Sequence, residues 1–162
     1  YGTVTGVQTC ALPIYGVHCF ELYGFRTWVV AFWSFIVARN GGDVLLDPVM
    51  VSVVVTLLAV PASVLGNELA LRFGRHRSIG SVMSCSAGVA IAVAASVSAP
   101  PWVLLALVVV YAFTLPGDSG ALTSGMALSA KPSERGATMA LHSMAGFAMA
   151  AVGGTEIGRA HV

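Results

Sequence analysis

The fold is decided by residues 78–117, SIGSVMSCSAGVAIAVAASVSAPPWVLLALVVVYAFTLPG, a stretch that contains no Asp, Glu, Lys, Arg or His. A helix needs about 20 mainly apolar residues to cross the hydrocarbon core of a bilayer, so this stretch is too long for one crossing. Pro100 and Pro101 divide it, because proline cannot continue a helix interior and the residue before it is displaced from the helical region. The stretch therefore predicts two membrane helices, 79–97 and 102–130, the second with one charge, at Asp118.

Three further segments have the same character. Residues 48–67 are free of charge, and Asp47 and Pro48 supply a capping side chain followed by proline at the first helical position. Residues 15–38 and 136–155 are apolar with few ionisable side chains. The apolar runs are continuous rather than alternating, and a bilayer admits only helices or closed barrels. We expect an all-α, polytopic membrane helix bundle with about five transmembrane helices, the last one cut short.

The composition supports a lipid environment. Of the 162 residues, 57% are hydrophobic and 9% are charged, whereas about a quarter of a soluble domain is charged. A net charge of +1 gives no basic field for nucleic acid. The three cysteines, Cys10, Cys19 and Cys85, are an odd number without metal-ligand spacing, so they indicate neither a disulfide framework nor a zinc site. The partner implied is the lipid bilayer, and no cofactor or metal is expected.

Both ends of the chain resemble translated oligonucleotide. Residues 4–14, VTGVQTCALPI, match the in-frame translation of a common sequencing-library adapter, and residues 156–162, EIGRAHV, match its reverse complement, whose next codon is a stop. One oligonucleotide in opposite orientations accounts for both, so these segments are excluded from the fold. We expect residues 15–155 to be the gene-derived domain, with the origin of residues 1–3 open.

The connections between the predicted helices differ in charge. Residues 72–77 hold three arginines and residues 131–135 hold two basic groups, while 98–101 are uncharged and 39–47 hold two acids against one base. Short loops rich in Lys and Arg stay in the cytoplasm. The domain is therefore predicted to start inside the cell and to end outside.

The first of these basic loops resembles a motif of a known protein family. Residues 69–77, LALRFGRHR, resemble the short cytoplasmic signature of the major facilitator superfamily, in which a Gly and then Leu-Ala-Asp-Arg-x-Gly-Arg-Arg join two helices; the matching residues are Leu69, Ala70, Arg72, Gly74, Arg75 and Arg77. Leu71 stands in the usual Asp position and Asn67 in the position of the first Gly, with Glu68 close by. The second basic loop matches a Pro-x-x-Arg-Gly connection of the same superfamily at Pro132, Arg135 and Gly136.

The resemblance implies a fold and a function. The degenerate signature and the absence of a membrane arginine from the fourth span are similar to the carboxy-terminal half of such proteins, so the five spans correspond to the seventh through eleventh of twelve. Residues 18–28, 66–71 and 118–123 look like one branch of prokaryotic members whose substrates are mostly unassigned. The implied protein is a secondary carrier in the bacterial cytoplasmic (inner) membrane, with multiple spans, which moves a small solute by alternating access and is not an enzyme.

Ionisable residues within the spans are the candidate site. Each costs about 3 kcal/mol or more on insertion scales, so it normally faces a cavity or a partner. Asp118 is a proton or substrate contact, or else a helix-packing acceptor for Ser, Thr or backbone groups. His18 and Glu21 lie one turn apart on one helix face and could couple a proton or contact a cargo. We expect Arg26 to be a structural pair for Glu21, and His142 to be a hydrogen-bonded packing residue rather than a proton carrier.

Small residues at fourfold spacing predict close helix packing in lipid. They form two stripes: Gly117, Ala121, Gly125 and Ser129, and then Gly146, Ala150 and Gly154.

Two alternatives to a carrier remain open. The string Gly117-Asp118-Ser119-Gly120 is similar to that of intramembrane serine proteases, with Ser119 as nucleophile and His142 as its base. The chain could also be an inactive truncated fragment, since half of a pseudo-symmetric carrier would be missing.

Overall fold

A computed structural model describes the backbone of residues 6–159 and the side chains of residues 12–155. All regular secondary structure in this part is helical, which confirms the all-α class: α1 (Gly6–Arg39), α2 (Pro48–Phe73), α3 (Arg75–Ala95), α4 (Pro101–Thr114), the 3₁₀ helix η1 (Leu115–Asp118), α5 (Ser119–Ser129) and α6 (Arg135–Arg159). Because α4, η1 and α5 follow one another without a gap, they form one helical segment, and the described chain has five such segments.

Three of the five are long and apolar enough to cross a membrane: Pro48–Phe73, Arg75–Ala95 and Pro101–Ser129. Many of their large apolar side chains, including Leu57, Val64 and Ile91, are exposed rather than packed inside the protein. Such a surface suits lipid, because a soluble protein rarely exposes large contiguous apolar area. The other two predicted spans form helices α1 and α6, which fall outside this set of three.

The start of α2 follows the predicted capping chemistry. The Asp47 carboxylate accepts hydrogen bonds from the backbone N–H groups of Val49 and Met50, at 2.8 and 2.9 Å, and Pro48 occupies the first helical position. These bonds satisfy two of the amide donors that a helix start leaves unpaired.

The connection between α2 and α3 is shorter than the predicted loop over residues 72–77. Gly74 is the single residue between the helices, and its φ of 93° lies in a region that glycine enters without steric cost. Arg72 therefore lies in the last turn of α2, and Arg75 begins α3. The basic groups are held on two helix ends rather than on a flexible loop.

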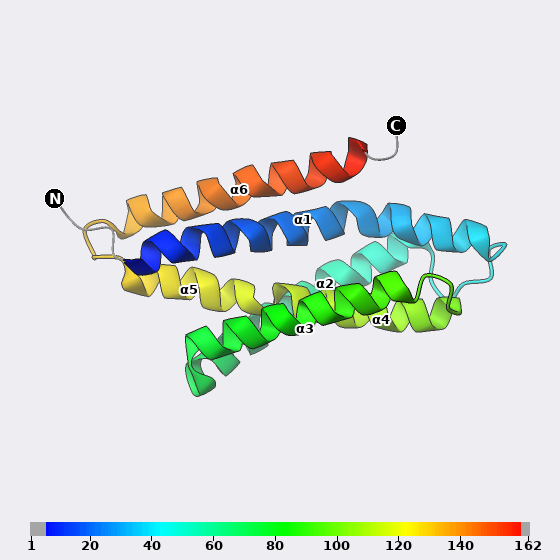
Figure 1. Cartoon of the computed structure of the whole chain (residues 1–162), viewed down its shortest axis with the longest axis horizontal. Helices are drawn as coiled ribbons and strands as arrows, with labels where there is room; N and C mark the ends of the chain where they lie inside the picture. Colours follow the sequence, from blue (N-terminus) through cyan, green and yellow to red (C-terminus); the bar gives the residue numbers. More distant parts are fainter. Residues whose placement is uncertain (1–5, 160–162) are drawn as a thin grey trace.

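Helix α1 lies in the middle of the bundle, with α6 alongside it in the same direction and the Pro101–Ser129 segment on its other side (Figure 1). The two basic connections, α2–α3 and α5–α6, lie at one end of the bundle, and the α1–α2 and α3–α4 connections lie at the other (Figure 1). At the second end the Arg39 guanidinium donates to the carbonyl oxygens of Val97 and Ala99. This arrangement agrees with the predicted alternation, and the assignment of ends to membrane sides stays a prediction.

The apolar core occupies the half of the bundle toward Arg39. It joins α1, α2 and α4 through nine buried side chains: Val29, Trp33, Ile36, Val51, Val55, Leu104, Leu105, Val108 and Ala112. Trp33 donates its indole N–H to the Leu46 carbonyl at 2.7 Å, so the largest core side chain also fixes the α1–α2 connection. His18, a buried polar residue of α1, lies toward the other end.

Glycines bring η1 and α5 against α2. A Cβ added at Gly66 would lie 1.5 Å from the carbonyl oxygen of Gly117, and one added at Gly120 would lie 2.8 Å from the carbonyl oxygen of Ser63. The predicted role of Gly117 in close packing is confirmed, and its partner Gly66 belongs to neither predicted stripe. Backbone touches backbone here, which holds η1 in a fixed position.

The second stripe packs α6 on α1 with one change of residue. Gly146 faces the ring of Tyr15 and the thiol of Cys19. A Cβ added at Gly153 would lie 2.5 Å from the Phe20 carbonyl oxygen. The predicted Gly154 has only an ordinary contact of 3.7 Å with Thr27. The close approach therefore falls at Gly153, because a helix turns 3.6 rather than four residues per turn and the stripe drifts.

Candidate functional site

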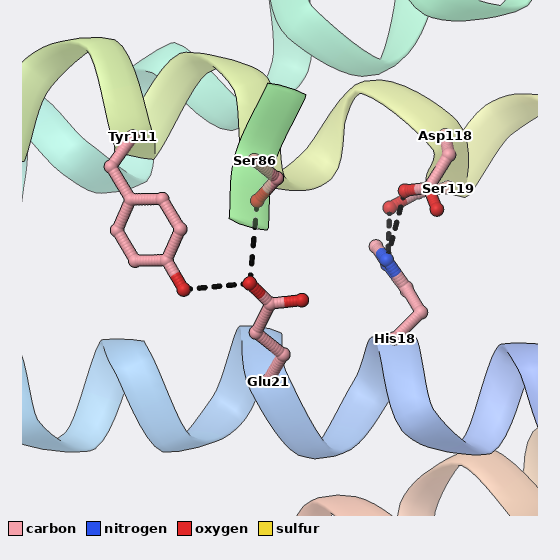
Figure 2. Close-up of polar contacts among 6 residues, drawn as sticks. All are labelled: His18, Glu21, Ser86, Tyr111, Asp118 and Ser119. Atoms are coloured by element: carbon pink, nitrogen blue, oxygen red, sulfur yellow. Dashed lines mark hydrogen bonds and ion pairs between the residues drawn. The ribbon is translucent and has the colours of Figure 1, made fainter. Parts of the chain in front are cut away.

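His18 joins α1 to the Pro101–Ser129 segment. Its Nδ1 lies 2.9 Å from Oδ1 of Asp118, and its Nε2 lies 2.7 Å from Oγ of Ser119 (Figure 2). His18 is 3% exposed and Asp118 is 2% exposed. Two ionisable groups are thus in direct contact and out of contact with solvent.

The break in the helix positions Asp118. η1 has the sequence Leu115-Pro116-Gly117-Asp118, in which Pro116 lacks an amide N–H and Gly117 admits the backbone of α2. A short 3₁₀ stretch within a longer helix often marks a hinge or a strained sequence. Pro116 lies in this 3₁₀ turn, whereas α2 continues through Pro61.

The Asp118 carboxylate has little compensation for its burial. Neither of its oxygens accepts a well-aligned hydrogen bond from a residue whose side chain is described, so the contact with His18 is its compensating interaction. A buried carboxylate without a partner would be costly, and the contact with the His18 imidazole offsets that cost. The helix-packing alternative predicted that Asp118 accepts from Ser, Thr or backbone donors. Its carboxylate contacts the His18 imidazole instead, so the predicted partners are wrong.

Glu21 lies one turn beyond His18 on the same face of α1, as predicted. Its Oε1 accepts hydrogen bonds from the Tyr111 hydroxyl at 2.7 Å and from the Ser86 hydroxyl at 3.3 Å (Figure 2). Glu21 thereby links α1 to α3 and α4, while His18 links α1 to η1 and α5. We call the six residues of Figure 2 the polar cluster: His18, Glu21, Ser86, Tyr111, Asp118 and Ser119.

Ser86 and Tyr111 were not predicted to belong to the site. Hydroxyl groups within apolar helices often bond to a carbonyl of their own helix, as Thr114 does with the carbonyl of Val110 at 3.0 Å. Nothing in the sequence around Ser86 or Tyr111 distinguishes them from such residues. Only the packing of α3 and α4 against α1 identifies them.

Arg26 does not pair with Glu21, which corrects that prediction. The salt bridges in the part of the chain with described side chains are His18–Asp118 and Glu68–Arg72. Five residues along an α-helix are separated by roughly 140° around its axis, so Arg26 is turned away from Glu21. Its guanidinium carbon lies 6.0 Å from the ring centroid of Tyr23, at the outer limit of a cation–π contact.

His142 is a packing residue, but the predicted hydrogen bond is wrong. It is 1% exposed and stacks on Tyr15 with ring centroids 3.6 Å apart and an angle of 20° between the planes. Neither ring nitrogen has a hydrogen-bond partner among residues 12–155. The imidazole bonded to Ser119 is that of His18, so the predicted pairing of Ser119 with His142 is also wrong.

The signature residues at the α2–α3 turn form two separate contacts. Arg72 pairs with Glu68 on its own helix at 2.9 Å, with both side chains largely exposed. Arg75 donates to the Ser124 hydroxyl at 3.3 Å, and Ser124 donates to Asn67 Oδ1 at 2.9 Å. The second contact connects α3, α5 and α2, so Asn67 has a bonding role in the position where the family signature has glycine.

The other matched residues have simpler environments. Ala70 is buried in α2, the Leu69 carbonyl accepts from Ser78 at 3.1 Å, and Arg77 is exposed. Pro132, in the second basic connection, and Arg135 and Gly136, in the first turn of α6, are exposed.

A cavity lies beside the polar cluster. Its volume is about 290 Å³, and its lining comes from α1, α3 and α4: Phe25, Trp28, Val29, Phe32, Ala90, Val93, Val108 and Tyr111. We call it the aromatic cavity. A second, apolar cavity of about 310 Å³ lies between α2, α3 and the Pro101–Ser129 segment. Among the described residues no group of three or more His, Cys, Asp or Glu side chains is placed to hold a metal ion.

Comparison of the chain with protein-family models, with curated proteins and with solved structures found no match in any of the three. The resemblance to a family therefore stays a prediction that rests on the motifs of residues 69–77 and 132–136.

Proposed function

We propose that residues 15–155 belong to a proton-coupled secondary carrier of the major facilitator type, from its carboxy-terminal half, in the bacterial inner membrane. The carrier moves a small solute by alternating access. The observation that carries the proposal is the buried His18–Asp118 pair at the break of a membrane-length helix.

The position of the pair supports transport over a purely structural role. A buried ion pair is weak support for stability, since an apolar replacement of similar volume is often neutral or stabilising. Ionisable groups inside a bilayer are mostly found on ion or substrate pathways. Transporters commonly place such groups at discontinuous helices, where the interrupted backbone lines the site. The 3₁₀ turn Leu115–Asp118 departs from α-helical geometry at the residue that carries the carboxylate.

The charge of the pair supplies a coupling mechanism. In a medium of low dielectric constant, the neutral combination with one shared proton is favoured over combinations with none or two. Loss of that proton leaves a net negative charge between α1 and η1, and the contact at 2.9 Å weakens. Protonation therefore favours the conformation in which these two elements touch, and deprotonation favours one in which they separate.

The test is uptake by the full-length protein encoded by the gene that contains residues 15–155, reconstituted in liposomes. A panel of radiolabelled cationic, neutral and anionic solutes is screened under an imposed pH gradient. Asp118→Asn keeps the shape of the side chain but cannot ionise, so gradient-driven uptake should fall at least tenfold while solute exchange at equal pH continues. Asp43→Asn, in the exposed α1–α2 connection, is the matched control. An uptake rate that is unchanged by the pH gradient and by Asp118→Asn would refute proton coupling.

A hydrolase is the second candidate, because one observation favours it. Asp118, His18 and Ser119 contact one another in the order of a catalytic triad, with different imidazole nitrogens facing the acid and the hydroxyl. However, the Ser119 amide N–H donates to the Pro116 carbonyl and is not available to an oxyanion. The Asp118 carboxylate also belongs to the residue next to the nucleophile, where it would oppose the developing negative charge.

Ser119→Ala separates the two candidates. If the protein is a carrier, transport survives the substitution, because the His18–Asp118 pair remains. If it is an intramembrane protease, cleavage of a fluorogenic membrane peptide disappears with the Oγ atom.

A further inference from the structure

Resting on the carrier function proposed above, we infer that the aromatic cavity, with Glu21 hydrogen-bonded to its wall at Tyr111, binds an organic cation: an ammonium group with apolar substituents. The inference assigns separate tasks to the two halves of the polar cluster. His18 and Asp118 hold the proton, and Glu21 faces the cargo.

The walls of the cavity fit an apolar body with a diffuse positive charge. Phe25, Trp28, Phe32 and Tyr111 contribute aromatic rings, and the remaining lining is aliphatic. Phe25 and Tyr111 pack edge to face, with centroids 4.7 Å apart and an angle of 72°, so their rings hold each other in place. The faces of such rings attract cations, most strongly when the cation has lost its water.

Glu21 supplies the charge. The Tyr111 hydroxyl that donates to Glu21 belongs to a residue of the cavity wall, so the carboxylate lies one hydrogen bond behind that wall. Both hydrogen bonds go to Oε1, and no side chain with a described position forms a salt bridge with Glu21. Arg26, the nearest cation in the sequence, contacts Tyr23 instead. A carboxylate between membrane-length helices without a cationic partner is costly, and a bound cation would remove that cost.

The same features exclude other solute classes. An anion would be repelled by Glu21. A sugar needs many hydrogen-bonding groups, whereas the lining is apolar except for Trp28 and Tyr111, and the Tyr111 hydroxyl already donates to Glu21. The volume of about 290 Å³ is just below the range of roughly 300–1,000 Å³ for small-molecule sites, so the cargo is small.

The test is a binding titration with two probes that differ in one atom. The full-length protein in lipid nanodiscs is titrated with choline and with 3,3-dimethylbutan-1-ol, in which carbon replaces the charged nitrogen. Tryptophan fluorescence reports binding, because Trp28 lines the cavity and Trp28→Phe identifies its share of the signal. We expect choline to bind at least tenfold more tightly than the neutral alcohol. Equal affinities for the two probes, or no binding of either, would overturn the inference.

Matched variants locate the charge. Glu21→Gln should abolish the preference for choline, Glu21→Asp should keep part of it, and Glu134→Gln, in the exposed α5–α6 connection, should leave it unchanged. A preference that survives Glu21→Gln also overturns the inference. If Glu21→Gln does not fold, the comparison of the two probes on the unaltered protein still tests whether the cavity prefers a cation.

The outcome is distinguishable from failure of the carrier function. Selective choline binding without gradient-driven uptake would refute proton-coupled transport and leave the cation site. Proton-coupled uptake of a neutral or anionic solute, with no choline binding, would refute the cation site alone.

Discussion

Replacing Gly66 by alanine should separate α2 from η1 and destabilise the protein. The added Cβ would lie 1.5 Å from the Gly117 carbonyl oxygen and 2.5 Å from its carbonyl carbon, far inside van der Waals contact. Both obstacles are backbone atoms, so no side chain can rotate away and one helix must shift by more than 1 Å. Overpacking of a tight interface costs about 1–3 kcal/mol, and the backbone clash puts Gly66→Ala at the upper end of that range.

The matched control is Gly88→Ala in α3. A Cβ at Gly88 would meet nothing within 4 Å, so this substitution only replaces a poor helix former by a good one and should stabilise by up to about 1 kcal/mol. The assay is reversible unfolding in mixed micelles with increasing dodecyl sulfate, followed by circular dichroism. Equal unfolding midpoints for Gly66→Ala and Gly88→Ala would refute the assigned helix contact.

Three further predictions follow from single contacts. His142→Phe should leave the unfolding free energy within about 1 kcal/mol of the original or raise it, because the ring still stacks and two buried nitrogens without partners are removed; a loss above 2 kcal/mol in the dodecyl sulfate assay would contradict this. Asp47→Ala should cost about 1 kcal/mol in the same assay through loss of the α2 cap, whereas Asp43→Ala, outside any cap, should be neutral. Tyr111→Phe should remove the shorter hydrogen bond to Glu21 and lower choline affinity several-fold in the fluorescence titration, and unchanged affinity would show that this bond does not orient the carboxylate.

The helical segments could be predicted from the sequence because their signals are local. Charge-free runs, the pair Asp47-Pro48 and the pair Pro100-Pro101 each mark a helix or its end within a few residues. The predicted boundary at residue 67 fell short of the observed end of α2 at Phe73, because Glu68 and Arg72 stabilise the last turns by pairing along the helix. Charged residues near the end of an apolar run can therefore extend the helix rather than end it.

The site was only partly predictable, because partners across helices have no fixed spacing. His18, Glu21 and Asp118 were identified by the cost of placing ionisable groups in lipid, which is a property of each residue alone. The contact between His18 and Asp118 depends on how α1 packs against η1, a hundred residues apart in the chain. The predicted partners of Arg26 and His142 were wrong for the same reason: distance along the sequence does not determine which helix faces a side chain.

The one-residue connection at Gly74 limits the motions available to this protein. Two long helices joined by a single residue have almost no slack, and the Asn67–Ser124–Arg75 hydrogen bonds fasten the same corner to α5. α2, α3 and α5 are therefore held together at this corner. Because Gly66 of α2 lies against the Gly117 backbone, a tilt of α2 would displace the turn that carries Asp118. A force applied to the exposed corner at Arg72 and Arg77 would thus reach the buried His18–Asp118 pair through packed backbone, without a ligand or a charge having to cross the distance between them.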